Sequence, residues 1–388
     1  MSAVSAESAV VVRGMGLACA LGVGVDRCVG GLTAGAVTAA PIDVRGLHEP
    51  LRMTYYRIPD QADLFAPTRT DRLLPSVAIE AVHAAGLTRE EIERLPIFVG
   101  SSAFSVGASE ARYAAALRAD RDTAYALPFV GFQHLAATLQ RALGNRGDTY
   151  AFNTACTAAA NAVMVAARMI RAGRYAHALV VGFELANITT LCGFRGLQLI
   201  ADVVKPFDLH RAGIVLGEGI GAVVLSASPG TGPGLYVHAG AANVDTHSVT
   251  TANPDGGSIA AVQLAVLGQA GIHASEIRGI KAHGTASPLN DTGEAAGIRR
   301  VFPELPRVCA MKPYVGHTLG ACGVTELVLF AAALGAGFFP GTPGFDTDDP
   351  ALQLSPARQR SSASPGHYLL DHFGFGGHNT ALLVEWRA

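Results

Sequence analysis

The stretch "FNTACTAAANAV", residues 152–163, places one cysteine between a short apolar run and a long series of small and apolar residues. The segment "DTYAFNTA" before Cys156 has the pattern of a strand. The segment "TAAANAVMVAARMIRAG" after it has the pattern of a helix that stops at Gly173. Two interpretations of Cys156 are open. It is a small thiol that fills a core, or it reacts at a helix start, where free N–H groups and the helix dipole favour the thiolate.

Apolar, β-branched runs alternate with helical stretches on both sides of this segment. The first series comprises "AVVVRGMGL", "LPIFVGSS", "DTYAFNTA", "HALVVGFEL" and "GIGAVVLSA", and the second comprises "LYVHAGAANV", "IRGIKAHG", "RVCAMK", "HYLLDHFGFGG" and "TALLVEW". Strands separated by helices predict βαβ units and a largely parallel sheet. The connector "SPGTGPG", residues 228–234, separates the two series. We therefore expect a pseudo-duplicated α/β fold whose halves, 1–230 and 231–388, share one core.

A second helical stretch, "TLGACGVTELVLFAAALGAG", follows His317 at a place comparable to that of the helix after Cys156. Both stretches are rich in small residues and apolar nearly all round, which is typical of helices buried between layers. Each helix would point its N-terminus towards the junction of the two halves. That junction is a natural position for an active site.

Composition narrows the class of protein further. Of the 388 residues, 49% are hydrophobic and 15% are charged, and the net charge of -2 gives no support for nucleic-acid binding. The longest apolar run, 327–339, is too short to span a bilayer, and the start lacks the basic region of a secretory signal. The six cysteines show no zinc-like spacing, so we expect reduced thiols, no metal and a cytoplasmic location.

Two histidines and one lysine stand at turns where chemistry is expected. His283, in "KAHGTASPLND", ends an apolar strand, and His317, in "MKPYVGHTLGACG", precedes the second apolar helix. Either histidine taken alone fits a structural role as well as a catalytic one. The chain has three lysines among 29 basic residues, which leaves 26 arginines, so Lys312 indicates a site that needs a compact ammonium. In "FGFGGHN", glycines flank Phe375, either for close approach to a ligand or for a tight hairpin.

Taken together, these segments resemble a known family. "NTACTAAANA", "KPFDLHRAGIVLGEG", "HGTASPLNDTGE", "KPYVGHTLGACG" and "FGFGGHN" are similar, in this order, to the motifs of β-ketoacyl-acyl carrier protein synthases, the elongating condensing enzymes. The resemblance runs from about residue 10 to the C-terminus. Thiolases and initiating synthases are similar in fold but replace one of the two histidines. The segment "KPYVGHTLGACGVTELVLF" looks closest to condensing enzymes of aryl-polyene pigment pathways.

The resemblance implies a thiolase fold with five layers, α-β-α-β-α. It implies that Cys156 is the nucleophile that takes an acyl chain from a pantetheine thioester. The N–H groups of Cys156 and Phe375 would form the oxyanion hole, and Phe375 would also gate the acyl pocket. His283 and His317 would hold the malonyl thioester carbonyl while carbon dioxide leaves, with Lys312 in support.

Further positions follow from the same resemblance. Four positions are expected to bind substrate. Thr285 and Ser287 match contacts to the pantetheine arm, Gly376 follows Phe375 in the gate loop, and Ala126 in "YALPF" matches the residue that caps the acyl pocket. Glu326 is expected to be a buried structural partner. No cofactor is expected, because the acyl carrier protein brings its own phosphopantetheine. That carrier protein is the expected partner, together with a second copy of the chain or a chain-length-factor-like homologue. Arginines are the candidate carrier-docking residues, namely Arg112, Arg118 and Arg121.

Two rival interpretations belong to other classes. A chain-length-factor-like subunit shapes the cavity of a heterodimer and lacks the nucleophile, which Cys156 and the two histidines argue against. A thiolase-type enzyme would use coenzyme A thioesters without decarboxylation. The set of one cysteine and two histidines favours the decarboxylating enzyme.

Overall fold

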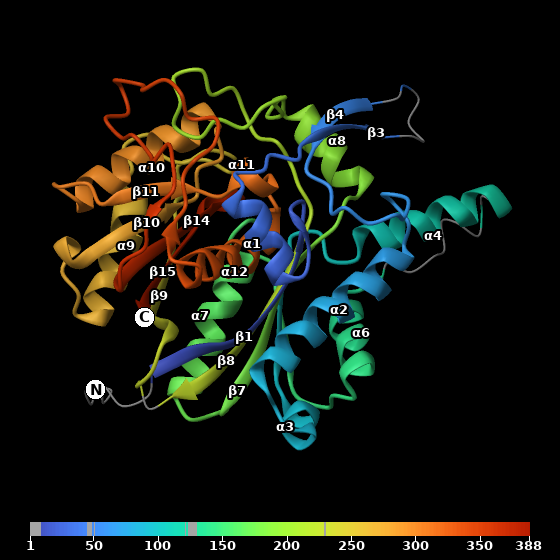
Figure 1. Cartoon of the computed structure of the whole chain (residues 1–388). Helices are drawn as coiled ribbons and strands as arrows, with labels where there is room; N and C mark the ends of the chain where they lie inside the picture. The colour runs from blue at the N-terminus through green and yellow to red at the C-terminus, as the bar shows by residue number, and fades with distance from the viewer. Residues whose placement is uncertain (1–8, 45–48, 50, 121, 123–129, 229) are drawn as a thin grey trace.

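Figure 1 shows the computed structural model of the chain, which describes residues 9–44, 49, 51–120, 122, 130–228 and 230–388. The large sheet has the strand order β11-β10-β14-β15-β9-β1-β8-β7-β5-β6, with β2 paired to β1. Its strands are β1 (Ala9–Cys19), β2 (Gly22–Val23), β5 (Ile97–Gly100), β6 (Thr149–Phe152), β7 (His177–Glu184), β8 (Gly219–Ser228), β9 (Gly234–Val244), β10 (Ile277–Ala282), β11 (Arg307–Ala310), β14 (Gly366–Gly374) and β15 (His378–Arg387). All ten predicted strands are present.

The strand order repeats along the chain. In 9–228 the order is β6-β5-β7-β8-β1 and in 234–387 it is β11-β10-β14-β15-β9, which in both cases is third, second, fourth, fifth, first. Hydrogen bonding between β1 and β9 joins the two sets.

The expectation of a largely parallel sheet is wrong for four of the ten strands in this repeated order. β5 pairs in parallel with β6 and β7, as β10 does with β11 and β14, whereas β1, β8, β9 and β15 pair antiparallel with their neighbours. The connection from β14 to β15 shows the reason. Only three residues, Phe375–Gly377, link them, and a parallel pair needs a crossover of about a dozen residues or more.

Helices complete five layers, which is the predicted thiolase architecture. Helices α2 and α6 pack on β1 and β5 at one outer face, α9 packs on β9 and β15 at the other with α10 beside it, and α7 and α12 lie between the two parts of the sheet (Figure 1). Their bounds are α2 (Thr68–Ala85), α6 (Gln133–Leu143), α7 (Ala158–Arg171), α9 (Gly257–Ala270), α10 (Pro288–Val301) and α12 (Cys322–Gly335).

The two central helices touch through their backbones. A Cβ on Gly323 of α12 would lie 2.1 Å from the backbone nitrogen of Ala160 in α7, so only glycine fits there. Helix α7 ends before Gly173, which takes a left-handed φ of 70° as predicted. Helix α12 does not begin at His317. Leu319 takes φ 45° and a 3-10 helix η2 (Leu319–Ala321) intervenes, so the α-helix starts at Cys322.

The remaining elements surround this core. They are α1 (Val25–Thr33), β3 (Ala40–Val44), β4 (Leu51–Tyr55), α3 (Arg89–Arg94), α4 (Val106–Ala119), α8 (Ile188–Gly196), η1 (Ala274–Glu276), α11 (Lys312–Val315), β12 (Phe338–Phe339), β13 (Ser361–Ser362) and η3 (Phe375–Gly377). Helix α4 buries none of its residues and projects from the edge of the molecule in Figure 1. None of the described helices is long and apolar enough to cross a membrane.

Candidate active site

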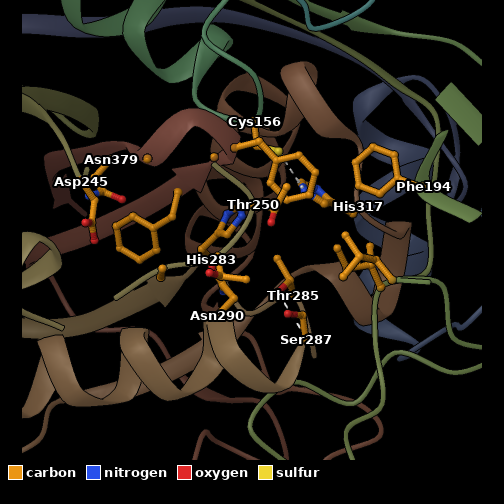
Figure 2. Close-up of a pocket in the computed structure, with 18 residues that line it drawn as sticks. Cys156, Phe194, Asp245, Thr250, His283, Thr285, Ser287, Asn290, His317 and Asn379 are labelled. Carbon is orange, nitrogen blue, oxygen red and sulfur yellow. Dashed lines mark hydrogen bonds between the residues drawn. The ribbon is translucent and has the colours of Figure 1, made fainter. Parts of the chain in front are cut away.

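Cys156 lies at the turn between β6 and α7, as the sequence predicts. Ala155 adopts a left-handed φ of 49°, which turns the chain sharply and sets Cys156 two residues before the first residue of α7. The side chain is 5% exposed and lines a pocket (Figure 2). Its Sγ lies 3.1 Å from Nε2 of His317. The sulfur is therefore a reachable group at a helix start rather than a sealed core thiol.

The pocket brings together six of the predicted site residues. Its lining includes Cys156, His283, Thr285, Ser287, His317 and Phe375. Cys156 comes from the first half of the chain, and the other five come from the second half. The remaining lining side chains are mostly apolar or small and polar, among them Phe194, Leu199, Ile214, Thr250, Asn290 and Phe373.

His317 presents a proton to the sulfur. The backbone N–H of Leu319 donates to Nδ1 of His317 at 3.3 Å, so Nδ1 is an acceptor and the ring proton resides on Nε2. Burial, reinforced by the charges of Lys312 and Lys281, holds the pKa of His317 well below its usual value. His317 is therefore a neutral imidazole whose Nε2–H points at Cys156.

His283 is also a neutral imidazole with its ring proton on Nε2. Its ring lies perpendicular to that of His317, with 5.3 Å between the ring centroids. The Nζ of Lys312 lies 3.3 Å from Nδ1 of His283, and an ammonium group can only donate, so the ring proton is on Nε2. Burial and the charge of Lys312 keep the pKa of His283 well below its usual value. Two neutral imidazoles thus face one pocket, each able to donate one N–H.

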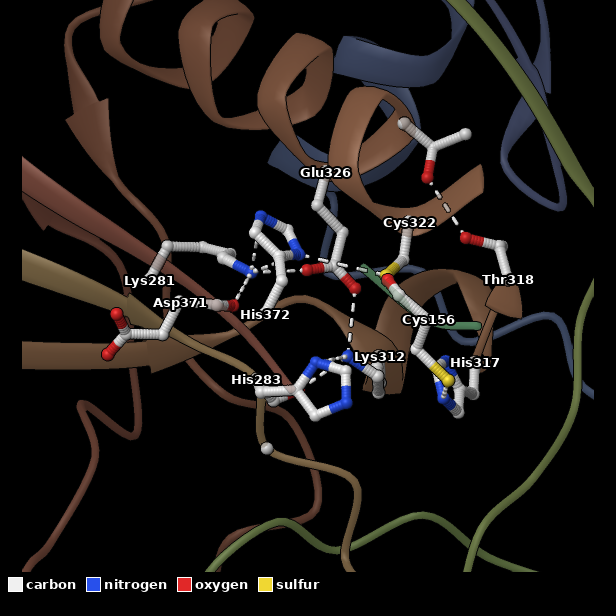
Figure 3. Close-up of polar contacts among 12 residues, drawn as sticks. Cys156, Lys281, His283, Lys312, His317, Thr318, Cys322, Glu326, Asp371 and His372 are labelled. Carbon is white, nitrogen blue, oxygen red and sulfur yellow. Dashed lines mark hydrogen bonds and ion pairs between the residues drawn. The ribbon is translucent and has the colours of Figure 1, made fainter. Parts of the chain in front are cut away.

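Lys312 lies behind this pair and is not part of the pocket wall (Figure 3). Its Nζ donates to the carbonyl of His283 and to Oε1 of Glu326, the latter at 3.0 Å, within a fully buried cluster. Burial alone would lower the pKa of Lys312, but the charge of Glu326 raises it above its usual value. Burial would likewise raise the pKa of Glu326, but Lys281 and Lys312 lower it. Both groups are charged, and Glu326 is a buried structural partner, as predicted, whose partners are Lys281 and Lys312.

The expectation that the helix start makes Cys156 a thiolate is wrong for the resting protein. Burial raises the pKa of Cys156 to about 12, although the charge of Lys312 and the backbone N–H of Phe375 act in the opposite direction. Removal from water penalises the charged sulfur more than these groups stabilise it. The thiol therefore keeps its proton until a reaction carries it away.

The loop 374–377 brings backbone N–H groups to the sulfur. The N–H groups of Phe375 and of Cys156 itself both act on Sγ. A Cβ on Gly374 would lie 3.0 Å from the backbone nitrogen of Cys156, so glycine permits this close approach. The loop is anchored by hydrogen bonds from Gly376 N–H to the Val249 carbonyl and from Asp245 N–H to the Gly377 carbonyl, both 2.7 Å long. Two N–H donors thus converge where a carbonyl bonded to Sγ would place its oxygen.

Phe375 forms part of the pocket wall. Its ring stacks on Phe194 of α8, with 5.4 Å between centroids and 17° between planes. Gly376, which was predicted to bind substrate, takes a left-handed φ of 78° that the turn requires, and it does not line the pocket. The segment 374–377 therefore forms the hairpin turn between β14 and β15 and also brings its backbone close to the pocket.

Thr285 and Ser287 lie on the loop that precedes α10. Thr285 is buried and Ser287 is half-buried at the N-cap of that helix, and both line the pocket beside Asn290 (Figure 2). The Ser287 N–H donates to Oγ1 of Thr285 at 3.3 Å, which fixes the turn. Two hydroxyl groups therefore face the same opening.

Sequence reasoning missed several residues of the site. Nothing in the sequence around Phe194 indicates that it lines the site, because its position depends on stacking with Phe375, which is distant along the chain. Glu294 accepts the N–H groups of His283 and Gly284 at 2.6 and 2.8 Å. It stood in the quoted motif "HGTASPLNDTGE" but was not singled out. Glu184 accepts N–H groups from Ser102, Ala103 and Gly320 beneath the pocket.

Two of the predicted positions, Ala126 and Arg121, lie outside the described residues. Arg112 and Arg118 are exposed on α4, which supplies no residue to the pocket wall. These arginines are free to meet a partner, but they do not mark the pocket opening.

Among the residues that the structure describes, two groups of side chains have ligand atoms within 4.8 Å of one another, which is near enough to consider a metal ion. The first, His283, Cys322 and His372, adjoins the ammonium groups of Lys281 and Lys312, which repel a cation. In the second, comprising His238, His367 and Glu385, the carboxylate already pairs with Arg387 and His238. Charge disfavours a metal ion at either place.

Comparison with known proteins points to one family. Residues 7–229 match the family described as "Beta-ketoacyl synthase, N-terminal domain", and residues 235–346 match "Beta-ketoacyl synthase, C-terminal domain". A 3-oxoacyl-[acyl-carrier-protein] synthase 2 of Vibrio cholerae is 28% identical over 334 residues, which is 80% of each chain. Nodulation protein E of a Rhizobium species is 28% identical over 366 residues, covering 89% of this chain and 90% of that one.

A solved structure, "The ishigamide ketosynthase/chain length factor", superposes with a TM-score of 0.87 at 27% identity. The match covers 99% of this chain and 100% of that one.

Proposed function

The chain belongs to the β-ketoacyl synthase family of condensing acyltransferases, and we propose that it catalyses decarboxylative Claisen condensation. In this reaction an acyl group held on Cys156 is joined to the malonyl thioester of an acyl carrier protein. One observation carries the proposal. The thiol of Cys156 and two neutral imidazoles, His283 and His317, face a single pocket, and each imidazole has its proton on Nε2.

The first half-reaction loads the acyl chain. The sulfur of Cys156 attacks the carbonyl of an acyl-pantetheine thioester, a new C–S bond forms, and the bond to the pantetheine sulfur breaks. The departing sulfur takes the thiol proton, so Cys156 needs no free thiolate in the resting protein. The carbonyl oxygen becomes negative in the tetrahedral intermediate and accepts from the N–H groups of Cys156 and Phe375.

The second half-reaction uses the two imidazoles. The malonyl thioester oxygen accepts from Nε2–H of His283 and of His317. When carbon dioxide leaves, the C–C electron pair enters the thioester as an enolate, and these donors stabilise the oxygen. The enolate carbon then attacks the acyl carbonyl on Cys156, a C–C bond forms, and the cysteine sulfur leaves and regains a proton.

Neutral imidazoles suit the enolate better than imidazolium ions would. A neutral N–H donates a hydrogen bond but is a far weaker acid than an imidazolium, so it protonates the enolate carbon much more slowly. An imidazolium would quench the enolate to acetyl thioester. Lys312 enforces the neutral form through its bond to Nδ1 of His283.

Thr285 and Ser287 line the pocket, and we assign their hydroxyl groups to the pantetheine amides. Phe375 acts as the gate of the acyl pocket, and separation of its ring from Phe194 opens the way to Cys156. No further cofactor is proposed.

An acyl carrier protein is the proposed partner. The name of the Vibrio relative states that it acts on acyl carrier protein, and such carriers are acidic. Arg195 is exposed on α8 next to Phe194 and so lies nearer the gate than Arg112 and Arg118 on α4. We propose Arg195 as a docking residue beside those two.

The assembly is proposed to be a homodimer or a heterodimer with a chain-length-factor-like homologue, in the cytoplasm. The ishigamide protein of similar fold is by name a ketosynthase/chain length factor, which supports the heterodimer. The aryl-polyene branch is the proposed pathway class, on the likeness of residues 312–330.

Variants of the three residues test the function. Cys156→Ala should abolish condensation, because no acyl-enzyme forms. His283→Ala and His317→Ala should retain acyl transfer to Cys156, seen by intact mass, while release of carbon dioxide from malonyl thioester falls by about 10²–10³, the usual effect of losing one oxyanion donor.

The same assays separate the rivals. A chain-length-factor-like subunit would show no acyl adduct on Cys156, and a thiolase-type enzyme would release no carbon dioxide. A histidine variant that condensed at the wild-type rate would refute the role assignment.

A further inference from the structure

The buried polar cluster behind the histidines contains a second lysine that the reaction scheme has not used. Lys281 comes from β10, where its register places it opposite Leu370 of β14 and Cys309 of β11. Its side chain is fully buried, and its Nζ lies 2.6 Å from Oε2 of Glu326. The protein has only three lysines, and two of them, Lys281 and Lys312, meet at one carboxylate (Figure 3).

The two ammonium groups bind different carboxylate oxygens of Glu326. Lys281 takes Oε2, and Lys312 takes Oε1. The three N–H bonds of Lys312 thereby have three acceptors, namely Oε1 of Glu326, the carbonyl of His283 and Nδ1 of His283. Lys281 completes its own set with the carbonyl of Asp371 at 2.7 Å and the ring of His372 at 3.5 Å. Without Lys281, Glu326 would have two oxygens for one ammonium and would compete with His283 for Lys312.

The net charge of the cluster of Lys281, Lys312 and Glu326 also depends on Lys281. Two ammonium groups and one carboxylate leave the cluster with one net positive charge, in a place without exposed surface. The nearby carboxyl groups do not cancel it at low pH, because burial raises the pKa of Glu294 to about 8 and that of Asp371 to about 7. The other titratable groups that face the cluster are His283, His317 and His372, whose pKa values are lowered by burial and by these lysines, and Cys309 and Cys322, whose pKa values burial raises.

We propose that Lys281 is a positioning residue of the condensation reaction: it fixes Lys312 on His283 and supplies the charge that keeps both imidazoles uncharged. This rests on the proposed function. Lys281 touches neither the pocket nor the reacting atoms, and it acts only through Glu326 and Lys312. Lys281 thereby favours condensation over the formation of acetyl thioester. A neutral imidazole leaves the enolate free to attack the acyl group, whereas an imidazolium would protonate the enolate.

The test measures, as a function of pH, whether the enolate attacks the acyl group or is protonated. With acyl-Cys156 already formed, malonyl thioester yields either the condensed product or acetyl thioester, and the ratio of the two is measured between pH 5.5 and 8. Lys281→Gln keeps hydrogen-bonding atoms at the position but removes the charge. We expect its ratio to shift at least tenfold towards acetyl thioester at pH 5.5 and little at pH 8, while loading of Cys156 stays within about threefold of wild type.

The matched control is Lys205→Gln, since Lys205 pairs with Asp346 and lines none of the pocket. It should show the wild-type ratio at every pH. An unchanged ratio in Lys281→Gln would overturn the proposal, and so would a loss of acyl loading in parallel with condensation, which indicates a merely structural role. Absence of acyl loading and decarboxylation in the unaltered protein would instead refute the proposed function itself.

A second measurement needs no variant, in case Lys281→Gln does not fold. The ¹⁵N resonances of labelled histidines in the wild-type protein should show His283 and His317 as neutral Nε2–H tautomers down to about pH 5, below the usual titration range of histidine. Titration of either ring with a midpoint above about pH 6 would overturn the proposal.

Discussion

Gly374→Ala places a single methyl group in the proposed oxyanion hole. The added Cβ would lie 3.0 Å from the backbone nitrogen of Cys156 and 3.4 Å from that of Thr157. Gly374 has φ -138° and ψ 160°, an extended conformation that alanine adopts without strain. The substitution therefore obstructs an N–H donor and leaves the conformation of the loop acceptable.

The size of the effect follows from the donor that is lost. Removing one oxyanion donor typically lowers a rate by about 10²–10³. Loading of Cys156 from an acyl-pantetheine thioester should fall by that factor, as followed by intact mass over time. Decarboxylation of malonyl thioester should stay within about threefold, because the donors for that step are His283 and His317. This pattern is the reverse of the one expected for the histidine variants.

Gly268→Ala is the matched control, because a Cβ at Gly268 in α9 meets no atom within 4 Å. It should load at the wild-type rate. The melting temperature of Gly374→Ala should also remain close to that of the wild type. Loading of Gly374→Ala at the wild-type rate would refute the assignment of the Cys156 N–H to the oxyanion hole.

Three other predictions concern the gate, the partner and pH. Phe194→Ala removes the ring on which Phe375 stacks. Since such a pair contributes about 0.5–1.5 kcal/mol, loading of Cys156 should become about 2- to 12-fold faster. An unchanged loading rate would contradict the role of Phe375 as a gate. Arg195→Glu should raise KM for carrier-bound acyl groups and leave that for free pantetheine thioesters unchanged; equal effects on both would argue against docking there. Burial, then the charge of Asp371, raises the pKa of Glu294 to about 8. The unfolded chain loses this proton near pH 4.5, so folding stability should fall as the pH rises from about 4.5 to about 8 and then level off, and it should fall less in Glu294→Gln; parallel melting curves across pH would contradict this.

The sequence predicted the ten strand segments and six residues that line the pocket, for physical reasons. Alternating apolar runs identify strands without knowledge of their partners, and the strand-to-helix turn places Cys156 at a helix start, although that position alone left both a structural and a reactive thiol open. His283 and His317 stand in turns with their own glycine and proline signals. Their meeting in one pocket followed only from the family resemblance, since nothing local encodes a contact across 161 residues.

The errors have a common origin in tertiary context. Strand direction depends on connections, and the three-residue link from β14 to β15 imposes an antiparallel pair that the alternation of helices and strands conceals. The protonation of Cys156 depends on burial by both halves, which outweighs the local helix start. Lys281 and Phe194 act through partners distant in the chain, so no neighbouring residue marks them.

The most direct test of the proposed reaction is one experiment on the unaltered protein. It is incubated with an acyl-pantetheine thioester and then with malonyl-acyl carrier protein, while peptide mass spectrometry locates the adduct and carbon dioxide is counted. We predict one acyl group on Cys156, followed by one carbon dioxide for each condensed product. An adduct on another residue, or condensed product without acylated Cys156, would contradict the central claim.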